Sequence, residues 1–354
     1  MSRLSKVFEL NRKGLNVPRG LFVLGLLVAL YLLLSVLDEQ RYWLSASFGA
    51  LFVGLSDPGG DYLGRVNRMG VFALLGAVLT LLGFGIGTDA WGLITFAAFV
   101  VTLAGGLAVM FGVHRFVAGV LLNTWFIITI GLAASYSSAG TQVHPGGQAL
   151  AWLGGALVWV ALTCAGWLLS GRAVRPAPVA EIPGDTSRRE LTTPLIMFAL
   201  IRAIAVAGAV AIAFGLNLPN AYWMPIATIV AMKSSLDQST LVAEQRLIGA
   251  TIGAVIASLC LLAIHSKYAL EVILVVLGAI GGSIRGVNYT LYAAAIAGCV
   301  LIASGVSHHP SNLGAEGQRV LYTFLGVGLA LIVMLLVDQL QKRTAAKAAP
   351  PQPA

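Results

Sequence analysis

The chain has 354 residues, of which 58% are hydrophobic and only 10% are charged, and its mean hydropathy is +0.88. A soluble domain needs a polar surface that this composition cannot supply, so we predict an all-α polytopic membrane protein. The formal net charge of +8 does not indicate nucleic-acid binding, because no soluble domain is expected that could carry a basic patch. The three cysteines lie in apolar segments without metal-binding spacing, and we expect no metal and no cofactor.

Apolar runs predict about 12 transmembrane helices, because a helix needs about 20 apolar residues to cross the hydrocarbon core. Residues 1–19 form a basic cytoplasmic lead-in, and the first membrane region is 20–170. Its predicted helices are 20–37, 42–55, 69–87, 91–112, 116–133 and 149–170. A cytoplasmic linker, 171–194, precedes the second membrane region, 195–337, and 338–354 is expected to be a disordered cytoplasmic tail. The helices predicted in the second region are 195–216, 221–232, 247–264, 268–283, 287–305 and 317–337.

The two membrane regions share a spaced pattern of residues. Tyr42-Trp43, Asp57, Arg68 and Gly76-Ala77 in the first recur as Tyr222-Trp223, Asp237, Arg246 and Gly253-Ala254 in the second. Six helices per region is an even number, so both regions enter the membrane from the same side and form two parallel six-helix repeats. Lys and Arg gather on one side when the N-terminus is inside, which predicts that both termini are cytoplasmic.

The second helix of each repeat is unusual. Segments 42–55 and 221–232 are short, and they are interrupted by glycine or by Pro225. Such segments at corresponding positions of two repeats are typical of broken helices that line a transport site. The alternative is a pair of ordinary short or tilted helices with flanking polar residues, such as Lys233, that reach to the interface.

Several cations are candidate anion ligands. Arg202 lies within an apolar segment, where an ionisable group costs about 2.5–3.5 kcal/mol on insertion scales, and Arg19 opens the first repeat at a corresponding place. Lys233 and Arg246 lie among acidic residues next to 221–232. They could form an electropositive vestibule, or they could pair with those carboxylates in an ordinary cytoplasmic loop.

The segments LPNAYWMP (218–225) and QRLIGATIGA (245–254), with Arg202 before them, resemble the fusaric acid resistance (FUSC) family of integral membrane transporters. The first repeat carries the pattern in decayed form, with Arg68 in the place of Arg246. Relatives of that family include bacterial exporters of aromatic acids and plant aluminium-activated malate transporters. Many members have a sizeable soluble region where this chain has only 171–194.

The resemblance implies a transporter of the bacterial inner (plasma) membrane that exports small organic acids, above all aromatic carboxylic acids. Residues expected to bind the anion are Arg202, Tyr222, Trp223, Lys233 and Arg246, with first-repeat counterparts Arg19, Tyr42, Trp43 and Arg68. The alternatives are a passive organic-anion channel, since no acidic residue lies deep in a predicted helix, and a non-transporting membrane enzyme or scaffold. We expect no enzymatic activity. Membrane lipids surround the protein, glycine-rich faces would permit a homodimer, and the need for a periplasmic adaptor stays open.

Overall fold

The computed structural model describes residues 7–57, 62–138, 140–142, 144–169, 191–220, 222–232, 236–264, 266–307 and 313–348. Every regular element in these ranges is a helix. The first half of the chain contains α2 (Val17–Val36), α3 (Trp43–Ser56), α4 (Tyr62–Ile86), α5 (Trp91–Leu107), α6 (Val113–Ser138) and α7 (Pro145–Leu169). Three short 3-10 helices are η1 (Arg12–Gly14), η2 (Gln40–Tyr42) and η3 (Ala108–Phe111).

The second half contains α8 (Thr193–Gly215), α9 (Trp223–Ala231), α10 (Leu236–Ala263), α11 (Lys267–Ile284), α12 (Tyr289–Ser307) and α13 (Leu313–Ala348). Each segment predicted from the sequence overlaps one of these α-helices. The largest differences are at helix ends, because charged residues expected in loops lie on helical turns. Helix α4 already includes Arg65 and Arg68, and α13 continues to Ala348, into the stretch expected to be disordered.

Seven helices in the described ranges are long and apolar enough to cross a membrane. They are Arg12–Val36, Tyr62–Ile86, Trp91–Phe111, Arg115–Ser138, Pro145–Leu169, Leu195–Gly215 and Val320–Val337. Many large apolar side chains on them face outward, among them Leu63 at 81% exposed and Val78 at 61%. An apolar outer surface is expected of helices in contact with lipid, and the chain is therefore a multi-pass membrane protein. The sequence predicts twelve crossings. In the described ranges, these seven helices have the length and composition to cross a membrane.

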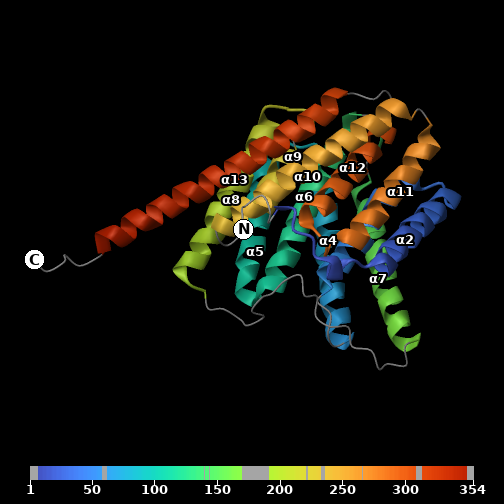
Figure 1. Ribbon diagram of the computed structural model, residues 1–354, viewed down its shortest axis with the longest axis horizontal. Coiled ribbons are helices and arrows are strands. Elements are labelled where there is room, and N and C mark those ends of the chain that lie inside the picture. Colours follow the sequence, from blue (N-terminus) through green and yellow to red (C-terminus); the bar gives the residue numbers. More distant parts are fainter. Residues whose placement is uncertain are drawn as a thin grey trace, which may run out of the picture.

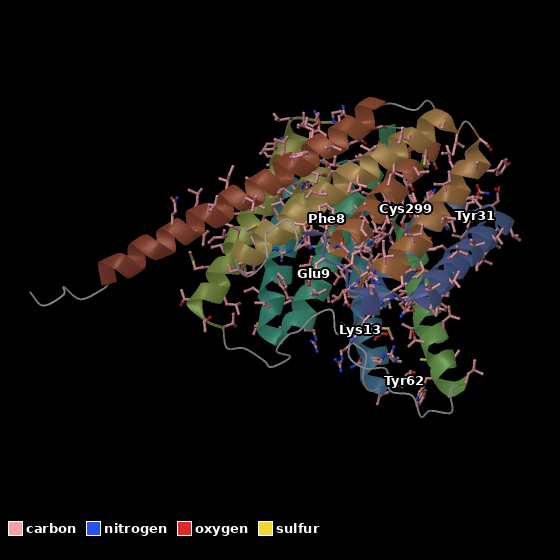
Figure 2. The ribbon with its side chains drawn as sticks, in the orientation of Figure 1. Phe8, Glu9, Lys13, Tyr31, Tyr62 and Cys299 are labelled. Atoms are coloured by element: carbon pink, nitrogen blue, oxygen red, sulfur yellow. The ribbon has the colours of Figure 1, made fainter. Side chains whose placement is uncertain are left out.

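Successive helices alternate in direction, as Figure 1 shows, so each half has one end where its even-numbered helices begin. We call this the basic end, because it carries Arg19, Arg65, Arg68, Arg115 and Arg285. Figure 2 shows Tyr62 there, at the start of α4, and Tyr31 near the far end of α2. The basic end corresponds to the side that the sequence predicts to be cytoplasmic.

The same helix pairings occur in both halves. In the first half α7 packs against α3 and α4, and α6 packs against α4 and α5. In the second half α13 packs against α9 and α10, and α12 packs against α10 and α11. The halves meet where α5 packs against α8 and where α11 packs against α2. A buried cluster that includes Phe126 of α6, Val206 of α8 and Ile226 of α9 continues the core across this boundary.

Candidate functional site

Helices α3 and α9 are the shortest α-helices described, with 14 and nine residues, and each lies inside its half. Helix α9 is buried from Trp223 to Ile229 and at Ala231. It is not broken by Pro225, the third residue of the helix, because the first N–H groups of a helix have no partner within it. Helices α3 and α9 are each one continuous short helix. In neither half does the described backbone form the two half-helices of a broken helix.

Arg202 of α8 is fully buried and points at the end of α9. Its Nη2 donates a hydrogen bond to the carbonyl oxygen of Ile229 at 3.0 Å, and its guanidinium carbon lies 5.0 Å from the ring centre of Phe116. Phe116 belongs to α6, so the guanidinium lies between helices of the two halves. Within the described part of the chain, Nε and Nη1 of Arg202 have no hydrogen-bond partner.

The contacts of Arg202 offset part of the free-energy cost of burying its charge. Ile229 is among the last four residues of α9, whose carbonyl groups have no partner within the helix, and a cation there also complements the helix dipole. Contact with the face of Phe116 adds a cation–π interaction. Nε and Nη1 nevertheless stay unpaired among the described atoms, and a carboxylate could provide the acceptors for both.

Among the predicted ligands of the second half whose side chains are described, Tyr222 and Trp223 do not lie beside Arg202. Tyr222 and Trp223 lie where α9 begins, and Trp223, six residues before Ile229, is about 9 Å from it along the helix axis. The Tyr222 ring packs against Gly131 of α6. Lys233 lies outside the described residues, and the side chain of Arg246, on α10, is outside them as well.

The first-half counterparts repeat one feature of this arrangement. Nη2 of Arg19, on α2, donates to the carbonyl oxygen of Gly54 at 3.5 Å, near the end of α3. Arg19 and Arg202 therefore approach the same end of the short helix of their own half. Unlike Arg202, Arg19 is partly exposed.

The remaining first-half candidates lie apart from Arg19. Tyr42 packs against Gly147, and Trp43 donates from Nε1 to the carbonyl oxygen of Leu27 at 3.4 Å, both at the end opposite the basic end. Arg68 is exposed and bonds to the carbonyl oxygen of Gly64 in its own helix at 3.2 Å.

Two features were missed by the prediction of site residues. Phe116 was treated as an ordinary apolar residue, and nothing in the sequence indicates that it faces Arg202. Gln148 is only 2% exposed, accepts a hydrogen bond from Ser45 and donates to the carbonyl oxygen of Arg41 at 3.2 Å. The sequence held a signal for Gln148, because Gly147-Gln148 in the first half recurs as Gly317-Gln318 in the second. Gln318 accepts a longer bond, 3.5 Å, from Asn220.

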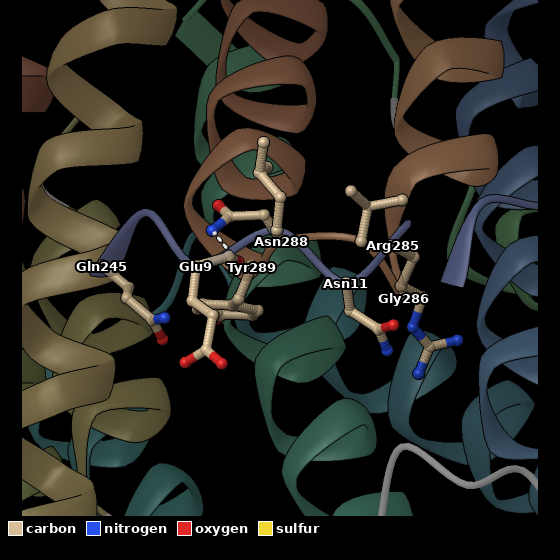
Figure 3. Close-up of a pocket in the computed structure, with 9 residues that line it drawn as sticks. Glu9, Asn11, Gln245, Arg285, Gly286, Asn288 and Tyr289 are labelled. Atoms are coloured by element: carbon tan, nitrogen blue, oxygen red, sulfur yellow. Dashed lines mark hydrogen bonds between the residues drawn. The ribbon is translucent and has the colours of Figure 1, made fainter. Parts of the chain in front are cut away.

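A cavity of about 490 Å³ lies at the basic end of the second half, and none of the predicted ligands lines it (Figure 3). The segment 7–16 crosses this end, where Asn11 donates from its backbone N–H to the carbonyl oxygen of Val287 at 2.9 Å. Asn288 donates from Nδ2 to the carbonyl oxygens of Val7 and Glu9, each at 3.0 Å. The segment thus fastens the start of the chain to the second half. Among the described side chains, His, Cys, Asp and Glu form no group able to hold a metal ion.

The described helices define a multi-pass membrane protein with a buried arginine where its halves meet. A comparison with models of protein families matches residues 187–333 to the family described as fusaric acid resistance protein-like. The matched range contains α8 to α12 and most of α13, so the family resemblance seen in the sequence is confirmed over the second membrane region. No curated protein and no solved structure matches the chain.

Proposed function

We propose that the protein transports small organic anions across the membrane and that Arg202 binds the anion. The observation that carries the proposal is the guanidinium of Arg202, which is fully buried between helices of both halves and has two unpaired donors among the described atoms. Charged groups in the middle of an apolar membrane helix are costly in free energy, and they occur mainly where a substrate or ion passes. The match to a transporter family over 187–333 supports the same function.

The proposal includes the parallel six-helix repeats. Equal helix pairings in the two halves, with α5 on α8 and α11 on α2, support a two-fold relation about an axis along the membrane normal. The basic end would face the cytoplasm of a bacterial cell and attract cytoplasmic anions electrostatically, as efflux of these anions would require. Apolar walls around Arg202 would favour acids with an aromatic or aliphatic body over small hydrophilic ones.

Passive flux is the second candidate, and the placement of the carboxylates favours it over proton coupling. Among the described acidic side chains, Glu9, Asp38, Glu39, Asp57 and Asp89 lie in connecting segments or at helix ends. Proton-coupled transporters commonly place a carboxylate deep in the membrane. An anion channel or facilitator needs none.

Flux of benzoate, malate and acetate from liposomes, with and without a pH gradient, tests both candidates. We expect benzoate to leave faster than from empty liposomes, at a rate that does not depend on the gradient. Arg202→Gln should reduce that rate at least tenfold, because it removes the charge and the fork of donors. Arg12→Gln is the matched control, since Arg12 is exposed at the basic end and its loss changes the net charge equally. Benzoate flux equal to that of empty liposomes would overturn the proposal.

A further inference from the structure

A second cavity, of about 400 Å³, lies at the basic end of the first half among α2, α3, α4 and α7. Its charged lining residues are Arg19, Asp57 and Arg65, and its apolar walls include Phe22 and Leu162. Two arginines and one aspartate give the lining a formal charge of +1. The cavity is therefore suited by size and charge to a singly charged ligand with an apolar body.

Arg65 provides a donor that no described residue of the protein uses. Its side chain is only 7% exposed, its Nε donates to Oδ1 of Asp57 at 2.9 Å, and its Nη2 donates to Oδ2. The guanidinium carbon lies 4.9 Å from the ring centre of Tyr62, which fixes its position further. Nη1 of Arg65 has no partner in the described ranges. A buried guanidinium normally completes its hydrogen bonds, and the described residues leave Nη1 without its usual acceptor.

Trp159 of α7 also lines this cavity, and it carries a second buried donor that no described residue uses. The residue is 9% exposed, its ring packs against Gly54, and the ring of Phe22 meets it edge to face with centres 5.2 Å apart. These contacts hold the indole in place, yet its Nε1 is also without a partner among the described atoms. Buried tryptophan N–H groups usually find a hydrogen-bond partner.

We propose that this cavity is an anion-binding site that takes the carboxylate of an organic acid between Arg65 Nη1 and Trp159 Nε1. Arg19 lies beside these groups and contributes the net positive charge. The aromatic and aliphatic walls receive the body of the acid. The assignment rests on the cavity and its two donors, and it does not depend on Arg202 or on transport. The phosphate group of an anionic lipid would make similar hydrogen bonds, so the experiment separates the two sources.

Binding of radiolabelled benzoate to the full-length protein in nanodiscs of zwitterionic lipid is the test. Saturable binding is expected. Trp159→Phe keeps an aromatic ring but removes the N–H together with the five-membered part of the indole, and it should weaken this binding at least tenfold, as expected for the loss of a hydrogen bond to a charged acceptor. The double variant Asp57→Asn/Arg65→Gln removes the ion pair without changing the net charge, and it should weaken binding by at least as much. Arg12→Gln should bind benzoate like the wild type.

The outcomes distinguish this site from the proposed transport function. Binding that is sensitive to Trp159→Phe and persists in Arg202→Gln supports the site, even if the wild type shows no flux. Equal binding in the wild type, Trp159→Phe and the double variant would overturn it, and so would the absence of saturable binding. Nanodiscs with phosphatidylglycerol form the second arm. Tight retention of that lipid by the wild type, with no benzoate binding in zwitterionic lipid, would also overturn the carboxylate assignment.

Discussion

The two halves place an arginine at the end of their short central helix, but in different surroundings. Arg19 is partly exposed and lines a cavity of about 400 Å³, whereas Arg202 is fully buried against Phe116. An exposed arginine can be hydrated at little cost, while a buried one needs partners. The comparison indicates that two cations can share one role, bonding to the end of a short helix, while their exposure differs.

Close backbone contacts are a feature that the halves share. Gly155 of α7 lies against the carbonyl group of Ala46 in α3, and Gly326 of α13 lies against that of Met224 in α9. A methyl group at either glycine would overlap the backbone oxygen of the neighbouring helix. Small residues allow such close approach of membrane helices.

The largest stability effect is therefore expected at these two glycines. Gly155→Ala and Gly326→Ala should each destabilise the protein by about 3 kcal/mol, because the two backbones must separate. Thermal unfolding in detergent measures the effect. Gly154→Ala and Gly328→Ala are matched controls, since no atom lies within 4 Å of a methyl group at either position, and they should change stability by less than about 1 kcal/mol. If either Gly155→Ala or Gly326→Ala leaves the stability unchanged, the close backbone contact does not have the same importance in the two halves.

A smaller effect is expected at the ends opposite the basic end, and it should differ between the halves. Ser45→Ala leaves the buried oxygen of Gln148 without its donor and should cost about 2 kcal/mol. Asn220→Ala removes a long, exposed bond to Gln318 and should cost less than about 0.5 kcal/mol. Thermal unfolding of both variants, with Ser138→Ala as an exposed serine control, checks this difference. Equal losses for Ser45 and Asn220 would contradict it.

The last comparison concerns Arg19 and Arg202, for which only small changes in stability are expected. The bond of Arg19 to Gly54 is 3.5 Å long and only partly buried, so Arg19→Met should change stability by less than about 1 kcal/mol. Arg202→Met loses a helix-end contact but also removes a costly buried charge, and these terms offset each other. We expect melting temperatures within a few degrees of the wild type for both. A collapse of Arg202→Met would instead favour a purely structural role for that arginine.

Apolar runs and charge placement predicted where the helices lie, because an apolar run of about 20 residues in a membrane protein is best satisfied as a helix. Helix ends were less predictable. Arg65 was expected in a loop, but its ion pair with Asp57 and its contact with Tyr62 allow it to lie on the first turn of α4. These partners are close in sequence, yet spacing alone does not indicate which pair forms.

The site was predictable only in part. An arginine inside an apolar segment is visible from the sequence, and Arg202 is indeed fully buried. Its neighbours depend on long-range packing, and neither Phe116 nor the carbonyl group of Ile229 could be inferred from local pattern. The cavity around Arg65 and Trp159 joins four helices, so no single segment carries a signal for it.

The most direct test of the central claim is the initial rate of benzoate efflux from liposomes that contain equal amounts of wild type and Arg202→Met. The account predicts that the variant unfolds within a few degrees of the wild type and loses at least nine-tenths of the efflux rate, while Arg12→Gln keeps it. A well-folded Arg202→Met variant that exports benzoate at the wild-type rate would contradict the account, because the buried guanidinium would then have no part in transport.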